Sequence, residues 1–304
     1  MRITIVGVGG IGGYYAGVLG RAGHEVQAFA RGATLQALLE RGAEVRTADG
    51  AFTVPVHATD DPAALAPADV ALVTVKSCAL DAVAPAVRAL AGRGADVVPL
   101  LNGVDAAERL ARGGVPRARL LGGVTYISAE RVAPGVAQLR SAFQRVLVGE
   151  LGGGVSPRAE RLAAAFRDAG VDARALPDIA LALWQKYVFI AAMAAACGLA
   201  RSAIGPLRET PLGRRLLERA VREAAAVGRA RGVALPADEE ARTLAFIDGL
   251  PAAMKPSFLL DLERGVPTEL DVLSGALAAM AAESGVETPV HDTAAAALAP
   301  ATGS

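Results

Sequence analysis

The chain has 304 residues, which is long enough for two domains with separate hydrophobic cores. Its 31 basic and 31 acidic side chains give zero formal charge, so it lacks the basic excess typical of proteins that bind nucleic acid. The few histidines and cysteines are scattered without ligand spacing, which argues against a metal site. We expect Cys78 and Cys197 to be buried small residues in a reducing compartment.

The sequence predicts neither a targeting peptide nor a membrane span. No signal peptide precedes the first predicted strand, which begins at residue 2. The most apolar stretch, residues 179–200, contains Gln185 and Lys186, and its uninterrupted apolar part begins only at Tyr187. That part is too short to cross a bilayer and is typical of a buried helix, so we expect a cytoplasmic protein with no membrane partner.

A glycine-rich turn follows the first predicted strand. The β-branched run from Ile3 to Val6 continues into Gly7-Val8-Gly9-Gly10-Ile11-Gly12, and a helix is predicted after it. Gly7 permits a tight turn, Gly9 lets backbone N–H groups approach a pyrophosphate, and Gly12 lets the helix pack closely on the strand. The Gly-x-Gly-x-x-Gly pattern is weak alone, but its place between a strand and a helix favours a dinucleotide site over a plain packing motif.

The end of the second predicted strand, residues 24–30, bears on the choice of dinucleotide. Folds that bind NAD usually carry Asp or Glu there, which accepts a hydrogen bond from the ribose 2′-hydroxyl. Here the strand ends in Ala30-Arg31-Gly32, and the planar guanidinium of Arg31 suits a phosphate. The sequence therefore predicts NADP(H) rather than NAD(H), unless Arg31 is an ordinary solvated side chain.

Strand and helix signals alternate over the first half and give way to helices in the second. A hairpin is predicted around Asp49-Gly50, with further strands over 69–75, 95–101, 120–128, 136–140 and 145–149, and helices over 33–40, 80–90 and 157–169. This alternation predicts a doubly wound α/β sheet of the Rossmann type over residues 1–176. An all-α domain is predicted over 177–304, with helices over 178–200, 206–232, 237–248, 256–264 and 268–284.

Polar residues in apolar surroundings are the candidates for chemistry. Lys186 lies in an apolar helix, where it either extends its ammonium to water or is desolvated, with a lowered pKa that suits a proton donor. Glu269 and Asp271 are further candidates, although acidic residues also favour the first turn of a helix.

Three more polar residues have equally plain alternative roles. Asn102 and Lys76 each follow a predicted strand, at the edge where open α/β sheets bind ligands, but Asn102 also suits a simple turn and Lys76 a solvated surface. Ser257 could contact a substrate or simply begin a helix.

Together these residues resemble the ketopantoate reductase (2-dehydropantoate 2-reductase) family over nearly the whole chain. The segments that carry the resemblance occur in order: the glycine turn, Gly23-His24-Glu25-Val26, Arg31, Val75-Lys76, Asn102-Gly103, Gly122-Gly123-Val124-Thr125, Trp184-x-Lys186, Ser257-x-Leu259-x-Asp261 and Pro267-Thr268-Glu269-Leu270-Asp271. Any one of these motifs is weak, but the ordered set is specific.

The resemblance implies a role for each candidate. Lys186 corresponds to the general acid that protonates a carbonyl oxygen as hydride arrives, and Glu269 to the acid that works with it and holds substrate. Asn102 corresponds to the asparagine near the nicotinamide and the substrate, and Ser257 to a substrate-contacting serine. Arg31 and Lys76 correspond to the pair that contacts the 2′-phosphate. The implied reaction is NADPH-dependent reduction of a 2-oxo acid or related carbonyl to the alcohol.

The match breaks on the helix that carries Lys186. The family commonly has asparagines four and eight residues after the lysine, where this chain has Ile190 and Ala194, and a third asparagine position is Ser274 here. A hydrogen bond to a charged partner is worth about 1.5–3 kcal/mol, so these losses would weaken ketopantoate reduction. Either the pocket takes a less polar or bulkier carbonyl substrate, which we favour, or polar contacts have moved to Ser257, Ser274, Arg201 or Ser202.

Two other functions stay open. The chain could be a non-catalytic NADP(H)-binding redox sensor or interaction protein, which the retention of Lys186 and Glu269 disfavours. It could also be similar to 3-hydroxyacid dehydrogenases, which usually keep an asparagine where Ile190 stands. The sequence leaves the oligomeric state open, a homodimer included.

Overall fold

The computed structural model describes residues 1–302, so the last two residues of the predicted helical domain lie outside the described part. The chain divides into two compact units. The first, the nucleotide unit, comprises Met1–Leu101 and Asp105–Ile179, and the second, the helical unit, comprises Asn102–Val104 and the chain from Ala180 onward. The three residues from Asn102 to Val104 therefore belong with helices that begin almost eighty residues later in the sequence.

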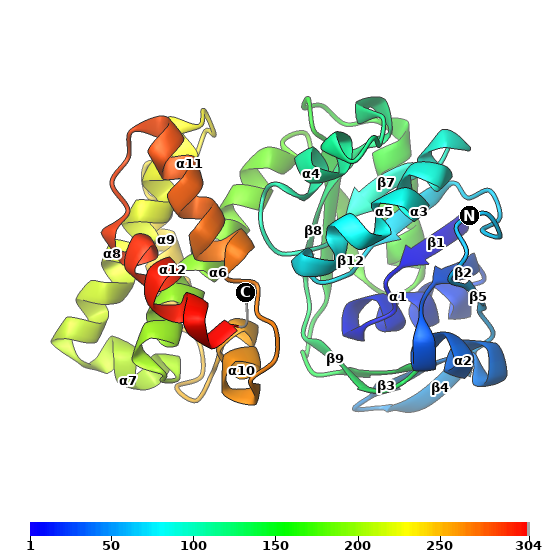
Figure 1. Ribbon diagram of the computed structural model, residues 1–304, viewed down its shortest axis with the longest axis horizontal. Coiled ribbons are helices and arrows are strands. Elements are labelled where there is room, and N and C mark those ends of the chain that lie inside the picture. The colour runs from blue at the N-terminus through cyan, green and yellow to red at the C-terminus, as the bar shows by residue number, and fades with distance from the viewer. Residues whose placement is uncertain (303–304) are drawn as a thin grey trace. The chain divides into compact units, whose positions relative to one another are not determined.

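A five-stranded parallel sheet forms the centre of the nucleotide unit, as the alternating pattern predicts (Figure 1). Its order is β5-β2-β1-β6-β7, with β1 (Arg2–Val6), β2 (Glu25–Phe29), β5 (His57–Thr59), β6 (Val70–Val73) and β7 (Asp96–Pro99). The connecting helices are α1 (Gly10–Arg21), α2 (Gly32–Arg41), α3 (Leu80–Gly92) and α4 (Ala106–Arg112). The chain leaves β1 for β2 on one side and later returns to β6 on the other, so the order reverses between β1 and β6, where such sheets bind ligands.

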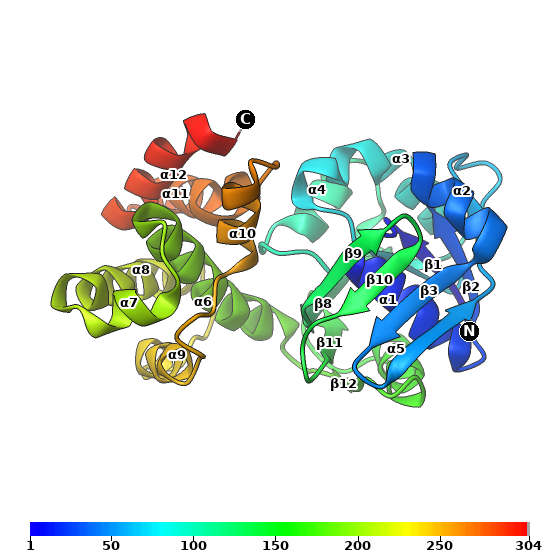
Figure 2. The ribbon, with the colours of Figure 1, turned by 90° about the horizontal axis from the view of Figure 1, so that it is seen from below.

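A second sheet covers helix α1. It has the order β4-β3-β10-β9, with β3 (Ala43–Thr47), β4 (Gly50–Val54), β9 (Ala129–Ala133) and β10 (Val136–Leu139), as Figure 2 shows. The predicted hairpin around Asp49-Gly50 joins β3 to β4. Glycines allow the close approach of this sheet to α1, because an added Cβ at Gly13 or Gly17 would press on Ala137 or Val45. Strand β9 was not predicted, and the strands beyond β7 do not simply extend the parallel sheet.

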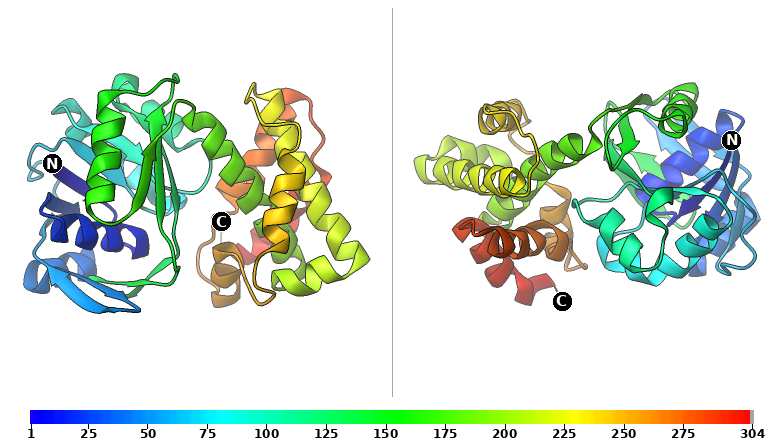
Figure 3. Two further views of the ribbon diagram at one scale, coloured as in Figure 1. Left: turned by 180° about the vertical axis from the view of Figure 1, so that it is seen from behind. Right: turned by 90° about the horizontal axis from the view of Figure 1, so that it is seen from above.

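The third sheet, of order β12-β11-β8, mixes parallel and antiparallel pairs. It contains β8 (Leu121–Tyr126), β11 (Arg145–Glu150) and β12 (Asp172–Ala175), and a single bridge from Leu120 to Val97 links it to β7. Helix α5 (Pro157–Asp168) packs on β11 and β12 (Figure 3). Ser156 caps this helix, since its Oγ accepts a hydrogen bond from the N–H of Ala159.

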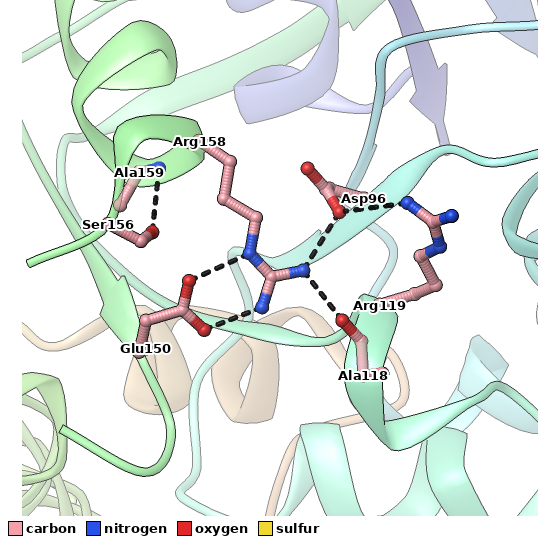
Figure 4. Close-up of polar contacts among 7 residues, drawn as sticks. All are labelled: Asp96, Ala118, Arg119, Glu150, Ser156, Arg158 and Ala159. Carbon is pink, nitrogen blue, oxygen red and sulfur yellow. Dashed lines mark hydrogen bonds and ion pairs between the residues drawn. The ribbon is translucent and has the colours of Figure 1, made fainter. Parts of the chain in front are cut away.

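An arginine on α5 ties the parallel sheet to the third sheet (Figure 4). The Arg158 guanidinium donates two hydrogen bonds to the Glu150 carboxylate, at 2.7 and 2.5 Å, and one to Asp96 at 2.9 Å. Asp96 begins β7 and Glu150 ends β11, so one planar cation joins two sheets. The Arg158 hydrogen bonds lower the pKa of the Glu150 carboxyl.

The helical unit contains the helices that the sequence predicts, with three corrections. Its elements are α6 (Ile179–Ala200), α7 (Ile204–Glu209), α8 (Pro211–Ala230), α9 (Glu239–Asp248), α10 (Ser257–Arg264), a π-helical turn (Asp271–Gly275), α11 (Ala276–Ser284) and α12 (Pro289–Thr302). The predicted helix 206–232 is two helices, because Thr210 caps a new helix that Pro211 begins. The predicted helix 268–284 begins only at Asp271, and α12 was not predicted.

The alanine-rich second half of α6 belongs to the hydrophobic core of the helical unit, in one cluster with residues of α8 and the later helices. By length and composition alone the whole helix could span a membrane, since it has 22 residues and a mean hydropathy of 1.6 over its most apolar window, whereas the prediction considered only the uninterrupted apolar part from Tyr187 onward. The structure buries 61% of that window, in agreement with the predicted buried helix. Cys197 is buried in this core as expected, whereas Cys78 is exposed, contrary to the prediction.

Candidate active site

The glycine turn of the nucleotide unit has the geometry of a phosphate-binding loop. Gly7 adopts φ +97°, which favours glycine, and a Cβ at Gly12 would collide with the carbonyl oxygen of Gly7 and with Thr74. An added Cβ at Gly9, by contrast, would meet nothing within 4 Å, so the backbone at the start of α1 is open to a ligand. Among the described residues, no side chain caps α1, and its first turn carries no acid. The turn therefore fits the pyrophosphate of a dinucleotide.

The remaining members of the turn differ in their surroundings. Val8 is buried in the core of the unit, and Ile11 packs partly against the same core. Gly10 lies against β9, since a Cβ there would collide with the backbone of Ala129. The side-chain positions of these residues thus serve packing, and only their backbone groups could contact a cofactor.

Arg31 and Lys76 follow strands on either side of β1. Arg31 comes two residues after the end of β2, and Lys76 comes three residues after the end of β6. Both side chains are exposed, and the Arg31 guanidinium donates a hydrogen bond of 3.1 Å to the carbonyl oxygen of Ala82 at the start of α3. Two cations therefore lie at the carboxyl edge of the sheet, where a phosphate group could bind between them.

The helical unit brings three of the predicted residues together. The Lys186 ammonium donates a hydrogen bond of 3.0 Å to Oδ1 of Asn102, and Nδ2 of Asn102 donates one of 2.8 Å to the Glu269 carboxylate. One amide thus bridges the cation and the anion with both of its ends. The three residues come from the segment after β7, from the middle of α6 and from the loop before the π-helical turn.

The surroundings of Lys186 suit proton transfer. Desolvation lowers the pKa of Lys186 to about 8, and the Glu269 carboxylate opposes part of that change. An ammonium with a pKa near 8 is a stronger acid than an exposed lysine, yet it stays mostly protonated at neutral pH. Such a group can stabilise the negative charge that develops on a carbonyl oxygen and then supply the proton.

The other predicted substrate-contacting residues do not join this group equally. Ile190 lies one turn after Lys186 on α6 and is partly exposed. Ala194 is only 2% exposed within the hydrophobic core, and Ser274 is 1% exposed with its hydroxyl 3.3 Å from Nδ1 of His291. Ser257 is exposed at the first turn of α10. The structure therefore gives no support to substrate contact by Ala194 or Ser274.

One buried polar residue next to this group was not among the predicted site residues. Tyr187, directly after Lys186, is 1% exposed, and its hydroxyl donates a hydrogen bond of 2.7 Å to the carbonyl oxygen of Leu273. The signal was present, because a buried tyrosine hydroxyl in an apolar helix needs a partner. Which partner it finds depends on the packing of distant segments.

Comparisons with known proteins identify one family for both parts of the chain. Residues 3–153 match the family model of ketopantoate reductase PanE/ApbA, and residues 178–301 match that of its C-terminal domain. A 2-dehydropantoate 2-reductase of Halobacterium salinarum is 34% identical over 302 residues, covering 96% of each chain. The crystal structure of 2-dehydropantoate 2-reductase from Geobacter metallireducens has a TM-score of 0.90 at 31% identity, covering 99% of this chain and 100% of that one.

A more distant structure shares the fold alone. D-mandelate dehydrogenase, solved with NADH and anilino(oxo)acetate, has a TM-score of 0.89 at 21% identity and covers 100% of this chain and 98% of that one. The family-model matches together span most of the sequence, and the fold is the predicted Rossmann-type domain followed by an all-α domain. The chain therefore belongs to the ketopantoate reductase PanE/ApbA family of oxidoreductases.

Proposed function

We propose that this protein reduces a 2-oxo acid or a related carbonyl compound to the alcohol, with NADPH as the hydride donor. The observation that carries the proposal is the hydrogen-bonded group of Lys186, Asn102 and Glu269 in the helical unit. Relatives named 2-dehydropantoate 2-reductase support the reaction class.

The bound cofactor would supply the hydride, and the protein would bind, orient and protonate. Lys186 places an ammonium where a carbonyl oxygen can accept its proton, since its lowered pKa makes that transfer easier. Asn102 holds the Lys186 ammonium through its carbonyl oxygen and the Glu269 carboxylate through its amino group. Glu269 keeps the site from losing its positive charge before substrate arrives, because it raises the pKa of Lys186 against desolvation.

The choice of NADPH rests on the nucleotide unit. Arg31 and Lys76 offer two exposed cations at the sheet edge, and β2 ends without the carboxylate that would accept from a ribose 2′-hydroxyl. A 2′-phosphate on the ribose suits both features. NADH is the alternative cofactor, as D-mandelate dehydrogenase was solved with it.

The substrate we propose is less polar than 2-dehydropantoate around the reacting carbonyl. Ile190 presents an apolar side chain one turn after Lys186, where the family resemblance leads us to expect an asparagine. The burial of Ser274 and its hydroxyl contact with His291 remove one of the residues that could have replaced the lost polar contact. Ser257, Arg201 and Ser202 stay as alternatives.

The test is a panel of 2-oxo acids, ketones and imines, assayed by oxidation of NADPH and of NADH with the wild-type protein and Ile190→Asn. We expect the wild type to prefer bulkier apolar 2-oxo acids, and Ile190→Asn to raise kcat/KM for 2-dehydropantoate by about tenfold relative to those substrates. Efficient turnover of 2-dehydropantoate by the wild type would contradict the altered pocket. Cofactor binding without turnover on the whole panel would instead support a redox sensor or interaction protein.

A further inference from the structure

Glu269 lies in a loop between two helical segments. Helix α10 ends at Arg264, the π-helical turn begins at Asp271, and Glu269 lies in the loop between them. Its carbonyl oxygen accepts a hydrogen bond of 3.1 Å from the N–H of Leu273 inside that turn. The position of the Glu269 carboxylate therefore depends on where the π-helical turn is fixed in the helical unit.

A side chain of α6 contacts this turn from the core. The hydroxyl of Tyr187 donates its hydrogen bond of 2.7 Å to the carbonyl oxygen of Leu273, the same residue whose N–H holds Glu269. Tyr187 itself is fixed, since it is buried and its ring packs edge-on against Trp184 at 5.5 Å. Lys186 precedes Tyr187 directly, so one short segment of α6 carries both the proton donor and the contact with the turn.

We propose that Tyr187 is a positioning residue. Through its hydrogen bond to the carbonyl group of Leu273, it fixes the loop of Glu269 in place relative to Lys186. The inference rests on the proposed function of Lys186 and Glu269 and adds a residue behind them in the core. Without this hydrogen bond, the turn would lose a direct link to α6, and the Glu269 carboxylate would shift from the position in which it accepts a hydrogen bond from Asn102.

A second anchor holds the next residue of the turn. Nε2 of His291 lies 3.1 Å from the carbonyl oxygen of Ala220 on α8, which can only accept, so Nε2 carries the proton and Nδ1 accepts from the hydroxyl of Ser274. Burial lowers the pKa of His291 to about 4, so the ring stays neutral and keeps this tautomer at neutral pH. The backbone N–H of His291 donates to the Glu223 carboxylate, which fixes the start of α12.

The alternative is that the Tyr187 hydrogen bond only satisfies a buried polar group and stabilises the fold. The two roles differ in one respect that can be measured. A positioning residue acts through Glu269, so its loss should matter only while the Glu269 carboxylate is present. Loss of a purely structural residue would lower kcat by the same factor with or without that carboxylate.

The first experiment is a double-mutant cycle on turnover. We expect Tyr187→Phe to lower kcat by about threefold to tenfold with an unchanged Kd for NADPH, and to have no further effect in a Glu269→Gln background. The matched control is Tyr15→Phe, which removes a fully buried hydroxyl bonded to Thr125 in the nucleotide unit. The same loss of kcat from Tyr187→Phe in both backgrounds would overturn the inference.

The second experiment needs no turnover. The chain has only three lysines, Lys76, Lys186 and Lys255, so the Nζ signals of lysine-labelled protein can be followed by NMR and assigned with Lys186→Ala. Because Glu269 is the charge that raises the pKa of Lys186, Glu269→Gln should lower that pKa. Tyr187→Phe should also lower the pKa of Lys186, but it should not lower it further in a Glu269→Gln background. Tyr15→Phe should leave the pKa of Lys186 unchanged. An unchanged pKa in Tyr187→Phe would overturn the inference.

These two readouts separate the inference from the proposed function. If the wild type reduces no carbonyl compound, the proposed function fails, and the NMR cycle still decides whether Tyr187 positions Glu269. If Tyr187→Phe does not fold, Ser274→Ala removes the second anchor of the same turn and should give the same pattern. Ser284→Ala is its control, because the Ser284 hydroxyl donates a hydrogen bond to the carbonyl oxygen of Met280 within its own helix α11.

Discussion

The two candidate sites of this protein are built from different parts of the chain. The glycine turn uses backbone groups of six consecutive residues, and its shape follows from the absence of side chains at Gly7, Gly9 and Gly12. The Lys186 group uses side chains from three segments that only the folded helical unit brings together. A site built from the backbone of consecutive residues can therefore be recognised in the sequence, whereas a site built from distant side chains can be recognised only in the folded structure.

The largest expected effect is on the side-chain site. Lys186→Ala should lower kcat by about a thousandfold or more while leaving the Kd for NADPH within about twofold, because the proton donor and the charge opposite the developing alkoxide are both lost. Steady-state kinetics and NADPH titration measure the two quantities. Normal turnover in this variant would remove Lys186 from its proposed role.

A substitution in the glycine turn should lower stability and cofactor binding rather than the rate of the chemical step. In Gly12→Ala, the new Cβ would collide with the Gly7 carbonyl oxygen and with Thr74, so we expect a loss of about 1–3 kcal/mol in the free energy of unfolding and weaker NADPH binding. Gly92→Ala is the matched control, because a Cβ there meets nothing within 4 Å. Denaturant unfolding and NADPH titration measure both variants, and equal stabilities would contradict the packing role of Gly12.

A smaller effect is expected at the sheet edge. Arg31→Ala should reduce the preference for NADPH over NADH by about tenfold, since a charge-assisted hydrogen bond to the 2′-phosphate would be lost while the pyrophosphate site stays intact. Arg41→Ala serves as control, because Arg41 is an exposed cation at the far end of α2, the helix that follows Arg31, and it pairs with the adjacent Glu40. An unchanged preference in Arg31→Ala would argue against its role in cofactor choice.

The smallest effect is a change with pH in the wild type. Lys186 must be protonated to act as the acid, so kcat for reduction should be full below its pKa of about 8 and fall as the pH rises through that value. Glu269→Gln should move this fall to lower pH, because the carboxylate that favours the ammonium is gone. A pH profile of kcat that stays flat through this range would contradict proton donation by Lys186.

Much of the fold could be predicted from sequence because local patterns decide it. The apolar run of β6 and the capped, proline-initiated start of α5 appear in consecutive residues. Helix α12 was missed because its partner lies far away in sequence, since Glu223 of α8 accepts from the first N–H groups of α12. The π-helical turn and strand β9 were missed too, although β9 pairs with β10, which follows it directly in the chain. Cys78 was predicted to be buried because cysteine is usually a buried residue type, but the fold leaves its side chain exposed.

The nucleotide turn and most strands and helices could be predicted from the sequence alone, because each depends on residues that are neighbours in the chain. The family could be predicted as well, because its short motifs occur in order along the whole chain. Only the tertiary structure decided that Asn102 belongs to the helical unit and joins Lys186 to Glu269, and that Tyr187 contacts the turn after Glu269. The physical reason is that hydrogen bonds and desolvation act over a few ångströms in space. Residues separated by 84 and 167 positions along the chain come within that range only when the helices pack.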